Sequence, residues 1–481
     1  MIHLYNTRTK TLEPFTPHQG NTVLLYTCGP TVYDNLHVGN WASFIYWDIL
    51  VRILTMNGFA VNRVMNITDV GHLVSDADDG EDKLEKGARR EGKTAWEVAQ
   101  MYSENFVKGL ELLNMVPPNH LVKATEFIEQ QLDLVRILKE KGYTYQIDDG
   151  IYFDTAQFPD YATFANLDLE SQKAGARVEV NNQKRSHSDF ALWKFTPAGT
   201  TRDMEWETPV DLLQENQGTN NKPRMGFPGW HLECSAIAMS ILGPTIDIHT
   251  GGIDHIPVHH TNEIAQSEAA SGQRFARFWL HNNHIKIDGT KISKSLGNTY
   301  TLEQLAERGF TGMDLRMFIL QGQYSNEGNF TFENLAAAKA RLHNWKNYAA
   351  LRHQIPADNQ PTVSLAAYQN NIQNAIANNL NTPAALKIID ESLRTLDNVP
   401  LTQLSQPDIL NFFNMVDDLL GLHIVASTPP ITSQQKNLIA KRQTARTEKD
   451  WTTSDTLRDQ LESEGIILND TANGTSWGYA S

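Results

Sequence analysis

The stretch 21–41, NTVLLYTCGPTVYDNLHVGNW, constrains the fold of this chain more than any other segment. An apolar run ends at Cys28, a Gly-Pro pair interrupts it, and a helix-like run starts near Trp41. We interpret this order as a strand, a loop and the N-terminus of a helix. Such a helix end binds phosphate, because its free backbone N–H groups and its dipole favour an anion. Gly39, close after His37, allows a nucleotide to approach the backbone.

The residues that follow extend this pattern into a larger unit. Residues 43–56 carry apolar side chains at near-helical spacing and end at an Asn-Gly pair, which favours a helix terminus. Residues 60–67 are typical of a second strand, and Thr68 follows in a loop. A strand, a helix and a strand in this order predict a βαβ unit. We therefore expect an α/β fold whose ligand binds at the carboxyl ends of the strands.

Length and charge set the broad class. With 481 residues the chain is long enough for about three or four domains. Its formal net charge of −15 argues against general binding to nucleic acid but is compatible with a local basic surface. The first residues lack an apolar signal core, no window is as long as a membrane span, and the only cysteines are Cys28 and Cys234. We expect a cytoplasmic protein that does not enter a membrane.

The periodicity changes several times along the rest of the chain. Residues 94–141 look helical and 143–195 alternate β-like pieces with turns, which predicts an inserted domain. Residues 196–229 are polar and predict a long loop. Residues 302–422 have Ala- and Leu-rich faces and predict a helical bundle. The charged stretch 76–91 is compatible with a solvated loop, and also with a mobile lid or an RNA-facing surface.

Four side chains are candidate metal ligands. His259 and Glu263 are four residues apart on an expected helix, so they share one face. With Cys28 and Cys234 they would complete a tetrahedral zinc shell. The same His-Glu spacing is common in exposed pairs, and isolated cysteines are commonly just buried. Spacing alone does not decide between these interpretations.

Two further motifs are candidates for nucleotide binding. Lys291 and Lys294 flank Ser293 on a glycine-punctuated loop and could hold a triphosphate as point charges. Gly252 and Asp254 follow an expected strand, where a carboxylate can accept hydrogen bonds from ribose hydroxyls. A solvated basic loop and an ordinary turn are the simpler interpretations of the two motifs.

In their order and spacing these segments resemble class I aminoacyl-tRNA synthetases. HVGN at 37–40 stands at the place of the first signature of that class, and KISKS at 291–295 resembles the second. The flanking segments TCGPTVYD, PGWHLECSA, HTGGID and HHTNEIAQSEA are similar to the cysteinyl-tRNA synthetase family. The pattern at 449–477 resembles the tail of the same family, so the resemblance covers nearly the whole chain.

The resemblance implies a zinc ion that selects the substrate. In that family two cysteines, a histidine and a glutamate hold zinc, and the matching residues here are Cys28, Cys234, His259 and Glu263. One zinc ion per chain would bind the thiolate of L-cysteine. An apolar pocket separates cysteine from serine poorly, whereas zinc prefers a soft thiolate to a hydroxyl. The implied substrate pocket is formed by Cys28, Gly29, Thr31, Thr68 and Trp230.

The implied reaction has two steps. The cysteine carboxylate attacks the α-phosphate of ATP and releases pyrophosphate, and a terminal ribose hydroxyl of tRNA(Cys) then attacks the adenylate. Positioning and charge stabilisation supply most of the rate, and Mg²⁺ accompanies ATP. The implied catalytic residues are His37, Asn40, Lys291 and Lys294. The implied ATP-binding residues are His37, Gly39, Asn40, Gly252, Asp254 and Lys294. We expect a monomer.

The resemblance also implies a domain order: a Rossmann-like nucleotide-binding core with an inserted domain, then an α-helical bundle and a small C-terminal domain. The expected boundaries are 1–110 for the first half of the catalytic domain, 111–200 for the inserted connective domain, 201–300 for the second half with the KISKS loop, 301–345 for a stem-contact region, 346–425 for the bundle and 430–481 for an anticodon-binding-type domain.

Some segments depart from the family pattern. Thr261 stands where the family has glutamate, residues 70–73 replace its Ile-Asp-Asp-Lys, and 211–225 look like an insertion. Three other functions remain open from sequence alone. They are an enzyme that joins cysteine to an amino-sugar, a tRNA-binding paralogue without activity, and an unrelated nucleotidyl transferase with a structural zinc. The full tail disfavours the first of these, and the intact signature residues disfavour the second.

Overall fold

A parallel sheet of five strands forms the centre of the computed structural model, with the order β12-β11-β3-β4-β5. Its strands are β3 (Thr22–Thr27), β4 (Ala60–Ile67), β5 (His120–Lys123), β11 (Ile246–Gly252) and β12 (Ala276–Asn282). The chain first builds from β3 towards β5 and later returns to add β11 on the other side of β3, where Tyr26 pairs with His249. Ligands of such sheets bind where the strand order reverses, which here is the carboxyl end of β3 and β11.

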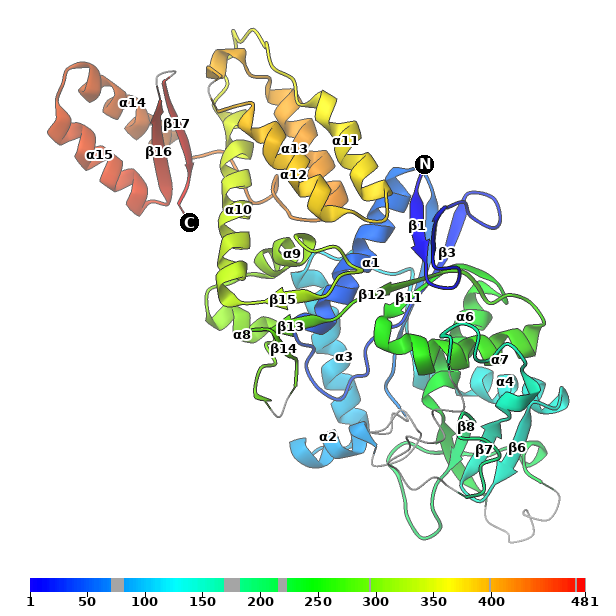
Figure 1. The fold of residues 1–481 in the computed structure, drawn as a ribbon. Coiled ribbons are helices and arrows are strands. Elements are labelled where there is room, and N and C mark those ends of the chain that lie inside the picture. The colour runs from blue at the N-terminus through cyan, green and yellow to red at the C-terminus, as the bar shows by residue number, and fades with distance from the viewer. Residues whose placement is uncertain are drawn as a thin grey trace.

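The structure describes residues 1–70, 82–167, 182–214, 223–293, 296–397, 399–471 and 474–480. The predicted strand–loop–helix is confirmed as β3, a loop and α1 (Val38–Met56), and β4 completes the βαβ unit. α1 crosses the middle of the molecule in Figure 1, and its apolar side chains are buried along nearly its whole length. No described helix combines the length and apolarity that a membrane span requires.

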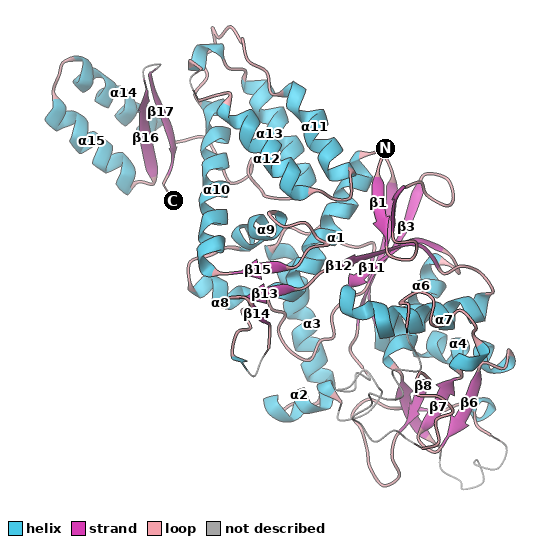
Figure 2. Ribbon diagram, viewed as in Figure 1, coloured by secondary structure: helices cyan, strands magenta, loops and turns pink. Residues whose placement is uncertain are grey.

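A second, antiparallel sheet is inserted between β5 and the return of the chain to the parallel sheet. Its order is β6-β7-β8-β10-β9, with bounds Thr144–Ile147, Gly150–Phe153, Phe190–Phe195, Met225–Pro228 and Trp206–Glu207. Figure 2 shows these strands at one end of the molecule, beside the helices α4, α6 and α7. Those helices span Ile128–Glu140, Trp230–Leu242 and Thr261–Ser271.

The secondary structure of two segments differs from what the sequence predicts. The stretch 196–229, expected as one loop, contributes β9 and β10 to the inserted sheet. The expected helical stretch 94–141 contains α3 (Ala95–Leu112), then β5 and α4. Short strands without alternating polarity form by pairing with residues that are distant in the sequence, and the periodicity of a local segment does not reveal such pairing. The domain boundaries themselves stay predictions. In the charged stretch 76–91, residues 76–81 lie outside the described residues, so its interpretation as a loop, a lid or an RNA-facing surface also stays a prediction.

The second half of the chain is largely helical, as expected. A small sheet of β13 (Ile285–Ile287), β14 (Thr290–Lys291) and β15 (Gly328–Phe330) follows β12, and an Asp288-Gly289 turn joins β13 to β14. The helices are α8 (Leu302–Glu307), α9 (Gly312–Leu320), α10 (Phe332–Ala350), α11 (Ala366–Ala377), α12 (Thr382–Arg394) and α13 (Gln406–Leu420). Two short elements precede the core, β1 (His3–Asn6) and β2 (Thr11–Pro14), and α2 (Lys83–Glu91) precedes α3.

The C-terminal unit stands apart from the rest at the side of α10 (Figure 1). It consists of α14 (Ser433–Thr447), α15 (Trp451–Ser463) and a hairpin of β16 (Ile466–Thr471) and β17 (Gly474–Tyr479). The backbone N–H of Trp477 donates to Gln354 at 2.8 Å, and that of Tyr479 donates to Asn347 at 2.9 Å. The tail therefore docks on the helical region through β17.

A buried ion cluster ties α1 to the helical region. The carboxylate of Asp48 accepts hydrogen bonds from Arg316 on α9 and, at 2.7 Å, from Arg52. Arg316 also donates to the carbonyl of Leu113 at 2.9 Å, and Arg52 donates to the carbonyl of Asp418 at 3.1 Å. Burial alone would raise the pKa of Asp48, but the two guanidinium groups more than offset it, so the pKa is lowered.

Asp48→Ala should lower the free energy of unfolding by about 3–5 kcal/mol, because it leaves the buried Arg316 without its counter-ion. Asp133→Ala is the matched control, since Asp133 pairs with Arg136 at an exposed site and its loss should cost at most about 1 kcal/mol. Urea unfolding followed by tryptophan fluorescence measures both. Equal destabilisation by the two variants would contradict the role given to the buried cluster.

Candidate active site and metal centre

The candidate site lies where β3 and β11 end. Cys28 directly follows β3, and its backbone N–H donates to the carbonyl of Thr250 at 3.2 Å, so the strand pairing places its thiol at the switch point. Cys234 is buried on α6, which packs against the parallel sheet. The thiol of Cys234 makes hydrogen-bond contact with Cys28 and with His259. Residues far apart in sequence are thus brought together by the return of the chain.

His259 and Glu263 meet across one helical turn, as their spacing predicts. His259 belongs to a π-helical turn (Ile256–His260) that leads into α7, and Glu263 lies in the first turn of α7. His259 Nε2 is 2.9 Å from Glu263 Oε1, yet this oxygen makes no hydrogen bond among the described residues. A donor nitrogen and a carboxylate oxygen that face each other in this way are suited to share a cation. His249 on β11 lies 2.9 Å from the other oxygen, Glu263 Oε2.

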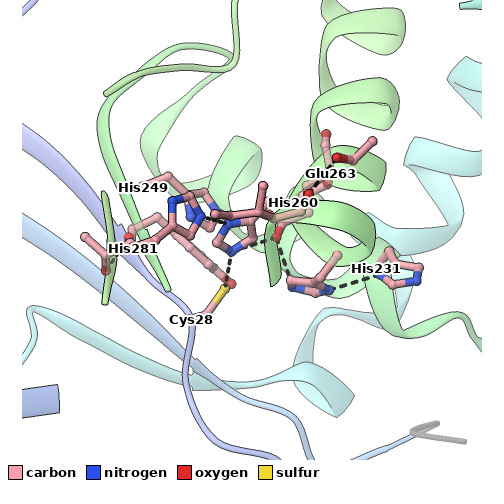
Figure 3. A network of polar contacts seen from close by, with 12 residues as sticks. Cys28, His231, His249, His260, Glu263 and His281 are labelled. Carbon is pink, nitrogen blue, oxygen red and sulfur yellow. Dashed lines mark hydrogen bonds and ion pairs between the residues drawn. The ribbon is translucent and has the colours of Figure 1, made fainter. Parts of the chain in front are cut away.

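Further histidines surround these ligand candidates (Figure 3). His260 Nε2 is 3.4 Å from Cys28 Sγ, and His260 Nδ1 is 2.7 Å from His281 Nε2. His231 Nδ1 is 3.0 Å from His259 Nδ1. None of His231, His249, His260 and His281 was predicted from the sequence as a site residue. The signal was present, since three of them lie inside the motifs HLEC, HTGG and HHTNE that were quoted for other residues.

The ligand atoms of Cys28, His259, His260 and Glu263 all lie within 4.8 Å of one another. This group shares three members with the predicted set and has His260 in the place of Cys234. A thiolate, an imidazole and a carboxylate in a buried pocket form the kind of donor set that zinc takes. The chemistry of the donors and the unbonded oxygen of Glu263 therefore fit zinc. Cys234 stays a predicted ligand, in contact with two members of the group.

The charges in this group depend on one another. Burial would lower the pKa of His259, but the neighbouring Glu263 carboxylate and Cys234 thiol outweigh it and raise the pKa to about 10. The pKa of Glu263 is lowered despite burial by His249 and His259. Burial lowers the pKa of His260 well below its usual range. A neutral imidazole such as that of His260 is the form that binds a metal.

The two thiols shift in opposite directions. Burial raises the pKa of Cys28 well above its usual value, with a further increase from the adjacent Cys234. The hydrogen bond from Cys28 lowers the pKa of Cys234 to about 6. One of the two sulfurs is thus readily deprotonated near neutral pH, as a thiolate ligand requires.

One cavity of about 750 Å³ connects the metal candidates to the start of α1. It is lined by all the predicted site residues that the structure describes except the fully buried Glu263, namely Cys28, Gly29, Thr31, His37, Gly39, Asn40, Thr68, Trp230, Cys234, Gly252, Asp254, His259 and Lys291. The ring of Trp230 stacks on His259 with the centroids 4.4 Å apart. Lys294 lies outside the described residues.

The start of α1 differs in one respect from the expectation. The ring nitrogen Nδ1 of His37 accepts hydrogen bonds from the backbone N–H groups of Gly39 at 3.2 Å and Asn40 at 3.3 Å. The helix is capped by His37 itself, so these two N–H groups are not free for a phosphate as the sequence interpretation assumed. His37 lines the cavity and can present its other ring atoms to a nucleotide.

The sequence matches family models and relatives among known proteins. Residues 14–340 match the family model for the class I (C) tRNA synthetase catalytic domain, and residues 428–477 match that for the cysteinyl-tRNA ligase anticodon binding domain. The chain is 41% identical to cysteine–tRNA ligase 1 of Burkholderia lata over 98% of its own length and 96% of the relative's. It is 36% identical to cysteine–tRNA ligase of Treponema denticola over 99% of both.

The fold is also similar to a solved structure. A complex of Mycobacterium tuberculosis methionyl-tRNA synthetase with methionyl-adenylate superposes with a TM-score of 0.58 at 14% identity, covering 85% of this chain and 90% of that one. At this identity the likeness concerns the fold alone, and it supports the α/β class I architecture.

Single substitutions should show which donor set holds the metal. Cys28→Ser should lower the zinc retained after dialysis, because the hydroxyl is a poorer ligand than the thiolate. Loss of zinc in Cys234→Ser with retention in His260→Gln would support the predicted set, and the reverse would support the set with His260. His284→Asn, which changes the same cavity outside both sets, is the control. Full zinc content in Cys28→Ser, measured by atomic emission, would contradict both sets.

Proposed function

This chain belongs to the cysteinyl-tRNA synthetase family of class I aminoacyl-tRNA synthetases, and on that premise we propose that it activates L-cysteine with ATP and transfers it to tRNA(Cys). The observation that carries the proposal is that Cys28 and His259, two members of the candidate metal-binding group, line the same cavity as the capped start of α1. The proposed metal-binding subsite and the proposed nucleotide subsite would thereby share one cavity.

We propose zinc as the resident metal, held by Cys28, His259 and Glu263 together with Cys234 or His260. When bound, the ion supplies a soft Lewis acid that prefers the substrate thiolate to the hydroxyl of serine. The ring of Trp230, stacked on His259, limits the movement of this ligand and forms one wall of the amino-acid pocket.

The remaining residues would orient the two reacting groups. His37, Gly39 and Asn40 at the start of α1, together with Gly252 and Asp254 after β11, would hold ATP. The amino-acid carboxylate then attacks the α-phosphorus, and the bond to pyrophosphate breaks. Lys291 lines the same cavity, and with Lys294 it would stabilise the charge on the departing pyrophosphate. Mg²⁺ is expected with ATP.

In the second step a hydroxyl of the terminal adenosine of tRNA(Cys) attacks the adenylate carbonyl, and AMP leaves. The match of 428–477 to an anticodon-binding domain supports a role of the C-terminal unit in binding this tRNA. We propose that the enzyme works as a monomer in the cytoplasm.

Cysteine-dependent exchange between ATP and labelled pyrophosphate tests the first step. The zinc-loaded protein should catalyse exchange with cysteine and should do so far more slowly with serine, because the hydroxyl does not replace the thiolate on the metal. Cys28→Ser, which weakens the metal site, should lose the cysteine-dependent exchange. Equal exchange with cysteine and serine, or full exchange by zinc-free protein, would refute metal-based selection.

Deletion of residues 431–481 tests the role of the C-terminal unit. The truncated protein should retain cysteine-dependent pyrophosphate exchange, since the cavity lies entirely outside the tail, and should charge tRNA(Cys) much more slowly. Exchange measured on the same preparation serves as the control for folding, because β17 docks on α10. Charging at the full-length rate would show that the tail does not contribute to tRNA recognition.

A further inference from the structure

The hydroxyl of Thr68 is held between two buried polar side chains. Thr68 follows β4, lines the cavity beside Cys28 and is only 2% exposed. Its hydroxyl lies 2.9 Å from Glu233 Oε2, and the side-chain amide of Asn66 lies 3.1 Å away on the other side. Glu233 is fully buried on α6, and its second oxygen, Oε1, makes no hydrogen bond among the described residues.

The direction of these hydrogen bonds is determined by one backbone group. The N–H of Gly29 contacts the amide of Asn66 at 2.8 Å, and a backbone N–H can only donate. The amide oxygen therefore faces Gly29, and the amide NH₂ group faces Thr68. Because the NH₂ group can only donate, Thr68 accepts there and gives its single proton to Glu233.

A hydroxyl carries one proton and two lone pairs, so one lone pair of Thr68 remains. The backbone holds the residue in place, since its N–H donates to the carbonyl of Pro30 at 3.0 Å and its carbonyl accepts from Val32 at 3.1 Å. Only glycine fits at position 29, next to Asn66, because a Cβ there would lie 1.5 Å from the carbonyl oxygen of Asn66. Thr68 thus offers the cavity an acceptor and no donor.

We propose that Glu233 and Asn66 are positioning residues that hold Thr68 as the acceptor for the α-ammonium group of the amino-acid substrate. This inference rests on the proposed function, because it takes the substrate thiol to be held at the neighbouring Cys28 group. An ammonium group has only donors, so it matches the remaining lone pair.

The test uses zinc-loaded wild-type protein and the variants Glu233→Leu, Glu233→Gln, Thr68→Ala and the double variant Glu233→Leu/Thr68→Ala. Pyrophosphate exchange gives the KM for cysteine and for ATP, and 3-mercaptopropionate, which has the thiol and the carboxylate without the amino group, serves as a competitive inhibitor. Glu233→Leu should raise the KM for cysteine about 10- to 100-fold, as expected for the loss of a hydrogen bond to a charged group. The KM for ATP, the zinc content and the inhibition constant of 3-mercaptopropionate should stay near the wild-type values.

Two further results separate positioning from a structural role. Glu233→Gln keeps an oxygen that accepts the proton of Thr68 and should recover most of the affinity for cysteine. In the Thr68→Ala background, Glu233→Leu should add no further increase in KM, because Glu233 would act only through Thr68. Asp69→Asn is the matched control: this buried carboxylate is bonded to Thr125 and lies outside the cavity, so its change should leave the KM for cysteine near wild type.

The inference is overturned if Glu233→Leu weakens 3-mercaptopropionate as strongly as cysteine, or if its effect persists in the Thr68→Ala background. Where Glu233→Leu does not fold or loses zinc, Asn66→Ala takes its place in the same double-variant comparison. It should raise the KM for cysteine by a smaller factor and leave the inhibition constant unchanged. Absence of cysteine-dependent exchange in the wild-type protein would refute the proposed function instead, so the two failures are distinguishable.

Discussion

The site depends on the pairing of the Glu263 carboxylate with two histidines. The carboxylate is fully buried, and His249 and His259 approach its two oxygens at 2.9 Å each. A buried charge without partners costs several kcal/mol, so these imidazoles must be in place when the core forms. Because His249 lies on β11 and His259 in the π-helical turn before α7, these contacts hold the strand and the turn against α7. They also place His259 beside the thiol of Cys234 on α6. The metal candidate is thus part of the core of the catalytic domain.

A second buried carboxylate connects this core to the rest of the chain. Asp48 lies on α1, the helix that His37 caps at the cavity. It pairs with Arg316 on α9, and its other partner, Arg52, donates to the carbonyl of Asp418 on α13, so both arginines tie α1 to the helical half. The helical half in turn carries the C-terminal unit through Gln354 and Asn347.

Much of this site could be predicted because its residues sit in motifs with local signals. The strand–loop–helix of 21–41, the i,i+4 pair of His259 and Glu263 and the KISKS loop each have a periodicity or a turn signature, and the resemblance supplied their association. The histidines around Glu263 carry no periodic signal of their own, so His249, His260 and His281 were missed. The capping of α1 by His37 was missed for a similar reason, since a histidine is not a usual N-cap residue. The strands β9 and β10 depend on pairing with the distant β8, which no local window contains.

In the proposed function, the substrate thiolate binds directly to a zinc ion held by this group. X-ray absorption spectroscopy at the zinc edge measures the number of sulfur neighbours of the metal without depending on turnover. On addition of cysteine to the zinc-loaded protein, we expect one more zinc–sulfur bond at about 2.3 Å, and no change on addition of serine. An unchanged sulfur shell in the presence of saturating cysteine would contradict it.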